Sequence, residues 1–124
     1  MIVGVGIELV DRQRFESLLD RFGDRLRDRL FTDGEREYAA RNKRDGESLA
    51  VRFAAKLAAR RALQTTALRW RDIEVVRDRQ GPPTLRLTGG AERAARRAGV
   101  SNIALTLTHD AQWCVGQVIL ESTQ

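Results

Sequence analysis

The chain has 124 residues, of which 42% are hydrophobic and 31% are charged. This length suffices for one hydrophobic core but is short for two, so we expect a single domain over residues 1–124. The apolar content argues against a disordered chain, and no apolar run approaches the length of a membrane span. Cys114 is the only cysteine and no positively charged leader opens the sequence. We therefore expect a cytoplasmic protein without a membrane segment.

The net charge of +5 comes almost entirely from arginine, because only Lys43 and Lys56 are lysines. Arginine favours an acidic partner, since its guanidinium makes paired contacts with phosphate or carboxylate groups. A solvated arginine-rich surface explains the same composition equally well. Nucleic acid is a disfavoured partner, because aromatic residues make up only 6% of the chain and no groove-reading motif is evident.

Apolar residues at every second position predict a first strand over residues 2–9. Glu8 points away from the apolar face of that strand. A helix should follow from Asp11, because the next apolar residues have helical spacing, and Gly23 provides a stop.

A second helix is predicted to begin after Thr32, where Thr32 and Glu35 can form a capping box, and to run to about Lys43. Residues 44–46 have the composition of a loop. A long helix is predicted over residues 47–63. Its buried stripe should consist of Leu49, Phe53 and Leu57, with Ala50, Ala54 and Ala58 beside them.

The second half of the chain has the pattern of strands around one short helix. A proline- and glycine-containing turn predicts a hairpin, and an alanine stripe that ends at Gly99 predicts the helix. The last two strands flank a turn that contains His109 and Asp110. The predicted elements are strand 72–77, turn 78–83, strand 84–87, helix 91–98, strand 103–108, turn 109–112 and strand 113–120.

Three segments resemble the holo-acyl-carrier-protein synthase family of 4'-phosphopantetheinyl transferases. They are GVGIELV at residues 4–10, RFAAKLA at residues 52–58 and LTLTH at residues 105–109. The resemblance covers nearly the whole chain. It implies an α+β fold in which helices pack on a small antiparallel sheet, and a homotrimer whose clefts lie between subunits.

The resemblance also implies a reaction, the transfer of phosphopantetheine from coenzyme A to a serine of an acyl carrier protein. Family members hold Mg²⁺ with an Asp in the first strand and a Glu after the helix lysine. Here these positions are Glu8, one methylene longer, and Leu57, which cannot bind a metal. We expect Glu8 to be the one remaining ligand and the Mg²⁺ site to be degenerate.

Two further segments depart from the family pattern. The glycine-rich turn that follows the long helix is replaced by QTTA at residues 64–67. The family's Gly-Lys-Pro turn is replaced by GPP at residues 81–83, which lacks the lysine. Both changes affect segments that would approach a phosphate.

The resemblance places the family's histidine, here His109, near coenzyme A, and Arg52 and Lys56 as further cofactor contacts. Lys56 has an alternative role as a helix-surface cation, and a lone histidine often serves the structure alone. Asp110 could orient His109 or raise its pKa. Glu8, His109 and Asp110 are therefore the candidate catalytic residues.

Carrier proteins are acidic and dock on the first helix in this family. Arg14, Arg21 and Arg25 would form one basic stripe there if the helix continued past Gly23. We expect this stripe to bind the carrier, with Arg14 the principal contact, although it could be ordinary solvated surface.

The metal-ligand positions and the turns that would approach a phosphate are altered. We therefore favour a protein repurposed for acid-base chemistry on a carrier-tethered fatty acyl or polyketide substrate. The alternative is a divergent but active phosphopantetheinyl transferase. A further alternative is a non-catalytic carrier-binding subunit.

Overall fold

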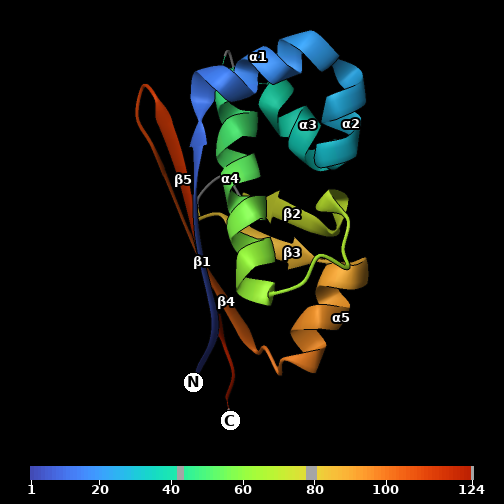
Figure 1. Ribbon diagram of the computed structural model, residues 1–124, viewed down its shortest axis with the longest axis vertical. Coiled ribbons are helices and arrows are strands. Elements are labelled where there is room, and N and C mark those ends of the chain that lie inside the picture. Colours follow the sequence, from blue (N-terminus) through green and yellow to red (C-terminus); the bar gives the residue numbers. More distant parts are fainter. Residues whose placement is uncertain (42–43, 78–80, 124) are drawn as a thin grey trace.

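The computed structural model describes residues 1–41, 44–77 and 81–123. Its longest helix, α4 (Asp45–Leu63), packs along one face of a three-stranded antiparallel sheet (Figure 1). The sheet has the order β1-β5-β4. Its strands are β1 (Ile2–Asp11), β4 (Asn102–His109) and β5 (Trp113–Glu121).

Short elements cover the sides of α4 that the sheet leaves open (Figure 1). Around its beginning lie α1 (Arg12–Phe22), α2 (Asp24–Leu30) and α3 (Asp33–Ala40). Around its end lie the 3₁₀ turn η1 (Trp70–Asp72), the hairpin of β2 (Ile73–Val76) and β3 (Thr84–Leu87), and α5 (Gly89–Arg97). The expected α+β architecture, with helices on a small antiparallel sheet, is confirmed.

The helix starts follow local side-chain chemistry. Asp11 accepts a hydrogen bond from the backbone N–H of Arg14 at 3.2 Å and so caps α1. Thr32 and Glu35 form the predicted capping box at the start of α3. Gly23 ends α1 with a φ of 61°, in the region that favours glycine. A separate helix, α2, which the sequence analysis did not predict, begins at the next residue.

Several boundaries differ from the predicted ones. Helix α4 begins at Asp45, inside the predicted loop, because Asp45 and Glu47 place negative charge at its N-terminal turn. Helix α5 begins two residues early, at Gly89. The predicted helix end at Lys43 and residues 78–80 of the predicted turn lie outside the described residues.

Glycines bring α4 unusually close to the sheet. A Cβ atom on Gly6 would lie 1.9 Å from the carbonyl oxygen of Ala58, and one on Gly116 would lie 2.6 Å from that of Ala54. The alanines of α4 therefore form its most buried stripe, whereas Leu57 is only partly buried. The prediction that Leu57 is a buried core residue is correct only in part.

The apolar face of β1 does not contact α4. Val5, Ile7 and Leu9 are between 50% and 60% exposed in the single chain, and the glycines of β1 take the helix-facing positions. Glu8 lies on the same side as those glycines, because successive residues of a strand face opposite sides. This alternation brings Glu8 to the edge of α4.

Candidate functional site

Glu8 meets an arginine of α4 in a first cavity, which we call the Glu8 site. Its carboxylate accepts from Nε of Arg61 at 2.5 Å. Leu57 lies one helical turn before Arg61 and lines the same cavity. The cavity has a volume of about 410 Å³. Its lining residues are Glu8, Leu57, Arg60, Arg61, Gln64, Thr65 and Thr66.

The end of α4 closes the Glu8 site. Gln64 takes the left-handed conformation with a φ of 55°, and its backbone N–H caps the helix. The hydroxyl oxygen of Thr65 then accepts from the backbone N–H of Ala67 at 3.1 Å. Arg60 stacks over the ring of Trp70 at 4.5 Å. The turn without glycines therefore still presents two hydroxyls and two guanidinium groups to one cavity.

The donor set of the Glu8 site does not fit Mg²⁺. This ion requires several oxygen ligands in near-octahedral geometry. The carboxylate of Glu8 is already engaged by a guanidinium, and its neighbour Leu57 is a hydrocarbon. Within the described part of the chain, no three His, Cys, Asp or Glu side chains are grouped so that they could hold a metal ion.

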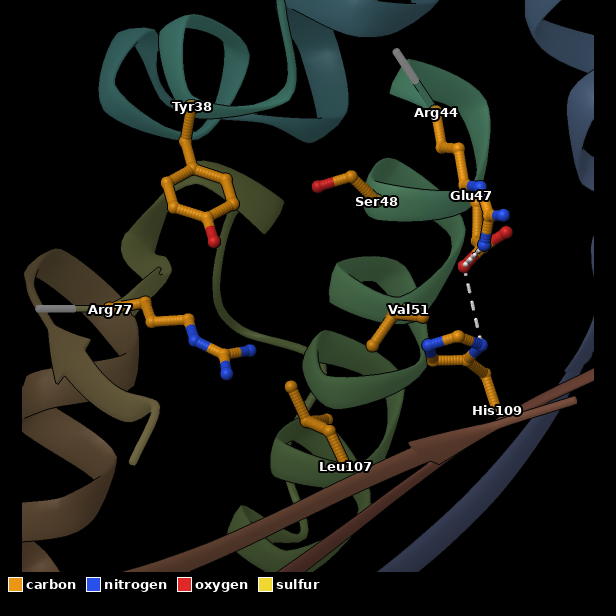
Figure 2. A pocket seen from close by; sticks show the side chains of 8 residues that line it. All are labelled: Tyr38, Arg44, Glu47, Ser48, Val51, Arg77, Leu107 and His109. Atoms are coloured by element: carbon orange, nitrogen blue, oxygen red, sulfur yellow. Dashed lines mark ion pairs between the residues drawn. The ribbon is translucent and has the colours of Figure 1, made fainter. Parts of the chain in front are cut away.

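A second cavity, which we call the His109 site, has a volume of about 480 Å³ (Figure 2). His109 enters it from the end of β4, and its Nδ1 lies 3.3 Å from a carboxylate oxygen of Glu47. Figure 2 shows the other ring nitrogen of His109 directed toward the cavity. The lining residues are Tyr38, Arg44, Glu47, Ser48, Val51, Arg77, Leu107 and His109.

The carboxylate beside His109 is not the one that the sequence suggested. Asp110 accepts from the backbone N–H groups of Trp113 at 2.6 Å and Gln112 at 2.8 Å, which fixes the β4–β5 turn. These two hydrogen bonds lower the pKa of Asp110. Glu47, from the first turn of α4, contacts His109 instead. No sequence spacing indicated this contact, because the two residues come from distant elements.

Lys56 is buried in the core and is not a helix-surface cation. Its ammonium lies 2.7 Å from a carboxylate oxygen of Glu35 and donates to the carbonyls of Trp70 and Ile73. Burial lowers the pKa of Lys56, an effect that the adjacent Glu35 opposes. Three oxygens occupy the three N–H donors of the ammonium. The expected cofactor contact is therefore corrected to a structural role.

Arg52 is also largely buried. Its Nη1 donates to the hydroxyl of Ser48 at 2.7 Å, and its guanidinium lies 4.2 Å from the centre of the Tyr38 ring. Burial lowers the pKa of Arg52. Since Ser48 and Tyr38 both line the His109 site, Arg52 supports the wall of that cavity without lining it.

One chain does not bring the three predicted catalytic residues together. Glu8 lies on β1, whereas His109 lies on β4 beyond the central strand β5. The Glu8 site and the His109 site share no lining residue and use different faces of α4.

The sequence analysis missed Arg61, although its position four residues after Leu57 places both on one helical face.

The predicted basic stripe is divided between two helices. Arg14 and Arg21 are exposed on α1, but Arg25 is on α2 because Gly23 ends the first helix. The condition for one continuous stripe is therefore not met. Leu18 and Phe22 are 40% and 49% exposed on the same helix as Arg14 and Arg21.

Comparison with known proteins identifies the family. The model of the 4'-phosphopantetheinyl transferase superfamily matches residues 4–117. The chain belongs to this superfamily. A holo-[acyl-carrier-protein] synthase of Solibacter usitatus is 43% identical over 125 residues, covering 98% of this chain and 100% of that protein. One from Methylorubrum extorquens is 47% identical over 129 residues, covering 98% and 95%.

Solved structures of superfamily members have the same fold. The holo-[acyl-carrier-protein] synthase of Neisseria meningitidis matches with a TM-score of 0.88 and 28% identity, covering 98% of this chain and 100% of that one. The synthase of Bacillus anthracis, solved with CoA (3',5'-ADP), matches with a TM-score of 0.81 and 34% identity, covering 99% of both chains. None of the helices described for the present protein has the length and apolar character to cross a membrane.

Proposed function

We propose that the protein transfers 4'-phosphopantetheine from coenzyme A to a serine of an acyl carrier protein. The observation that carries this proposal is the full-length match to holo-[acyl-carrier-protein] synthases, one of them solved with CoA (3',5'-ADP). The comparisons do not support the favoured hypothesis of repurposed acid-base chemistry on a tethered substrate. They agree better with the alternative, a divergent transferase.

In the proposed reaction, the serine oxygen forms a bond to the β-phosphorus of coenzyme A, and the bond to the bridging oxygen breaks. 3',5'-ADP leaves with that electron pair. We assign the serine proton to the open ring nitrogen of His109, which faces its cavity (Figure 2). Glu47 then stabilises the imidazolium through its contact with Nδ1.

A homotrimer would complete the site. The Glu8 and His109 sites lie on different faces of α4, and a neighbouring chain would allow one substrate to contact a Glu8 site and a His109 site together. The exposed apolar row of β1, formed by Val5, Ile7 and Leu9, supplies a surface for such contact. Sedimentation analysis of Ile7→Arg tests this: we expect dissociation and loss of transfer, and an unchanged oligomeric state would contradict it.

The carrier surface is proposed on α1. Arg14, Leu18, Arg21 and Phe22 have the spacing of one helical face and are all exposed, which combines positive charge with apolar area. Arg25 on α2 can contribute only from a second helix. Reversal of Arg14 and Arg21 to Glu should abolish carrier binding in calorimetry, and an unchanged affinity would contradict this surface.

The buried, unpaired Cys114 agrees with a reducing cytoplasmic compartment.

The decisive experiment is incubation with apo carrier protein and coenzyme A, once with Mg²⁺ and once with EDTA, followed by intact-mass analysis of the carrier. We expect a mass gain of one phosphopantetheine arm. His109→Ala should slow the gain by about 10²- to 10⁴-fold while carrier binding persists. Carrier binding without a mass gain in either buffer would overturn the proposal in favour of a non-catalytic subunit.

A further inference from the structure

Glu8 and Leu57 occupy the two positions at which the family pattern implies metal ligands, but Glu8 is paired with Arg61 and the residues of this site do not fit Mg²⁺. We propose that Arg61 supplies the fixed positive charge that faces the pyrophosphate of coenzyme A, so that this site binds its substrate without a divalent ion. This inference rests on the proposed function for the identity of the ligand. The inference itself concerns how the Glu8 site binds the pyrophosphate.

The contacts of the pair show how it could serve a phosphate. The Glu8 side chain is 24% exposed and that of Arg61 is 65% exposed, so the pair is anchored on the strand and open at the guanidinium. Arg61 uses Nε for Glu8. A guanidinium has five N–H donors, and the four on its terminal nitrogens have the fork geometry that suits phosphate oxygens. One side chain can therefore be held by Glu8 and still bind an anion.

The charges of the cavity show why Leu57 matters. Arg60 and Arg61 contribute two positive charges and Glu8 contributes one negative charge, which leaves the lining at +1. A glutamate in place of Leu57 would reduce this sum to zero and would lie one helical turn from Arg61, where it would compete for the guanidinium. The hydrocarbon removes that competitor. The cavity thus keeps a positive charge that does not depend on an ion.

Other groups of the cavity are available for the same ligand. The hydroxyl oxygen of Thr65 accepts from Ala67, so its O–H remains a donor. Arg60 is stacked on Trp70, which fixes a second guanidinium beside the first. These donors take the place of the backbone donors that a glycine-rich turn would offer.

Calorimetric titration of coenzyme A and of 3',5'-ADP, in EDTA and in Mg²⁺, tests the inference on the full protein. We expect the Kd of each ligand to be the same in both buffers within about twofold. Arg61→Gln should raise the Kd about 10- to 100-fold in both, because charged hydrogen bonds to phosphate are lost. Arg96→Gln is the matched control, since Arg96 forms an exposed ion pair with Glu92 on α5. The Kd of coenzyme A and that of 3',5'-ADP should not change in this control variant.

Titration with Mn²⁺ followed by electron paramagnetic resonance provides a readout that is independent of transfer. The native protein should bind no Mn²⁺ in the micromolar range, and Leu57→Glu should gain binding because it adds a second carboxylate next to Glu8. Micromolar Mn²⁺ binding by the native protein would overturn the inference. An unchanged Kd in Arg61→Gln would also overturn it.

The two proposals fail in different ways. Transfer that proceeds with Mg²⁺ and stops in EDTA would overturn the metal-free site and leave the transferase assignment intact. Absence of transfer in both buffers, together with metal-independent binding of coenzyme A that Arg61→Gln weakens, would overturn the transferase assignment and support the metal-free phosphate site.

Discussion

Two cations of α4 that lie only five residues apart, Lys56 and Arg61, each pair with a carboxylate of another element, and the two pairs have opposite surroundings. Lys56 and Glu35 are 2.7 Å apart, and both side chains are fully buried. Arg61 and Glu8 are 2.5 Å apart, but the arginine is 65% exposed and the pair lines a cavity. Nearly equal distances therefore accompany different roles, one in the core and one at the surface.

The difference shows that burial decides what such a pair can do. The ammonium of Lys56 has used its three donors on Glu35 and two backbone carbonyls, so it can join α3, α4 and β2 but cannot bind a ligand. The guanidinium of Arg61 donates from Nε to Glu8, and the side chain is 65% exposed. Lys56, within the family motif, thus joins elements of the core, while Arg61, outside the three matched segments, lines the Glu8 site.

The largest loss of stability is expected when the buried pair of Lys56 and Glu35 is broken. Lys56→Met leaves the carboxylate of Glu35 buried without its cation, which typically costs about 3–5 kcal/mol in the free energy of unfolding. Urea denaturation followed by circular dichroism measures this change. A loss below about 1 kcal/mol would show that the pair is not structural.

A second variant keeps this test informative if Lys56→Met does not fold. In Lys56→Met combined with Glu35→Gln, the amide oxygen can accept from only one of the backbone N–H groups of Thr32 and Val75, which now donate to the two separate carboxylate oxygens of Glu35. Neither residue of the original pair then carries a charge. The double variant should therefore be more stable than Lys56→Met alone, and an equal or lower stability would contradict the explanation.

Periodicity and capping residues predicted most of the fold, because these signals are local. Thr32 and Glu35 marked the start of α3, and alternating apolar residues marked β1. The location of Lys56 was not predictable, since its partner Glu35 and the carbonyls that it contacts come from other elements. The same holds for Glu47 and His109. The pairing of Glu8 with Arg61 required the strand-to-helix distance that only the packed glycines fix.

An intermediate effect is expected at the contact that sets this distance. Gly6→Ala would force its Cβ against the carbonyl of Ala58 and push β1 away from α4. We expect a loss of about 1–3 kcal/mol in the free energy of unfolding from overpacking. Gly81→Ala is the matched control, because a Cβ there meets no atom of the described residues within 4 Å.

Because Glu8 follows Gly6 on β1, the same variant should also weaken coenzyme A binding under conditions in which it remains folded. Lys56→Met, studied likewise in its folded state, should bind coenzyme A as the native protein does. Urea denaturation and calorimetry measure the two properties separately. A Gly6→Ala protein as stable as Gly81→Ala would show that the close contact does not hold β1 in place.

The smallest effect on stability is expected for the exposed pair. Arg61→Met should change the free energy of unfolding by about 0–1 kcal/mol, because an ion pair open to water gains little from Coulomb attraction. That difference should vanish in 1 M NaCl, where screening acts over about 3 Å. A loss comparable to that of Lys56→Met, unchanged by salt, would instead make Arg61 a structural residue. A small loss of stability combined with a large loss of coenzyme A affinity would distinguish Arg61 from Lys56. A residue of the binding cavity can change the affinity without changing the stability, whereas a core residue changes the stability first.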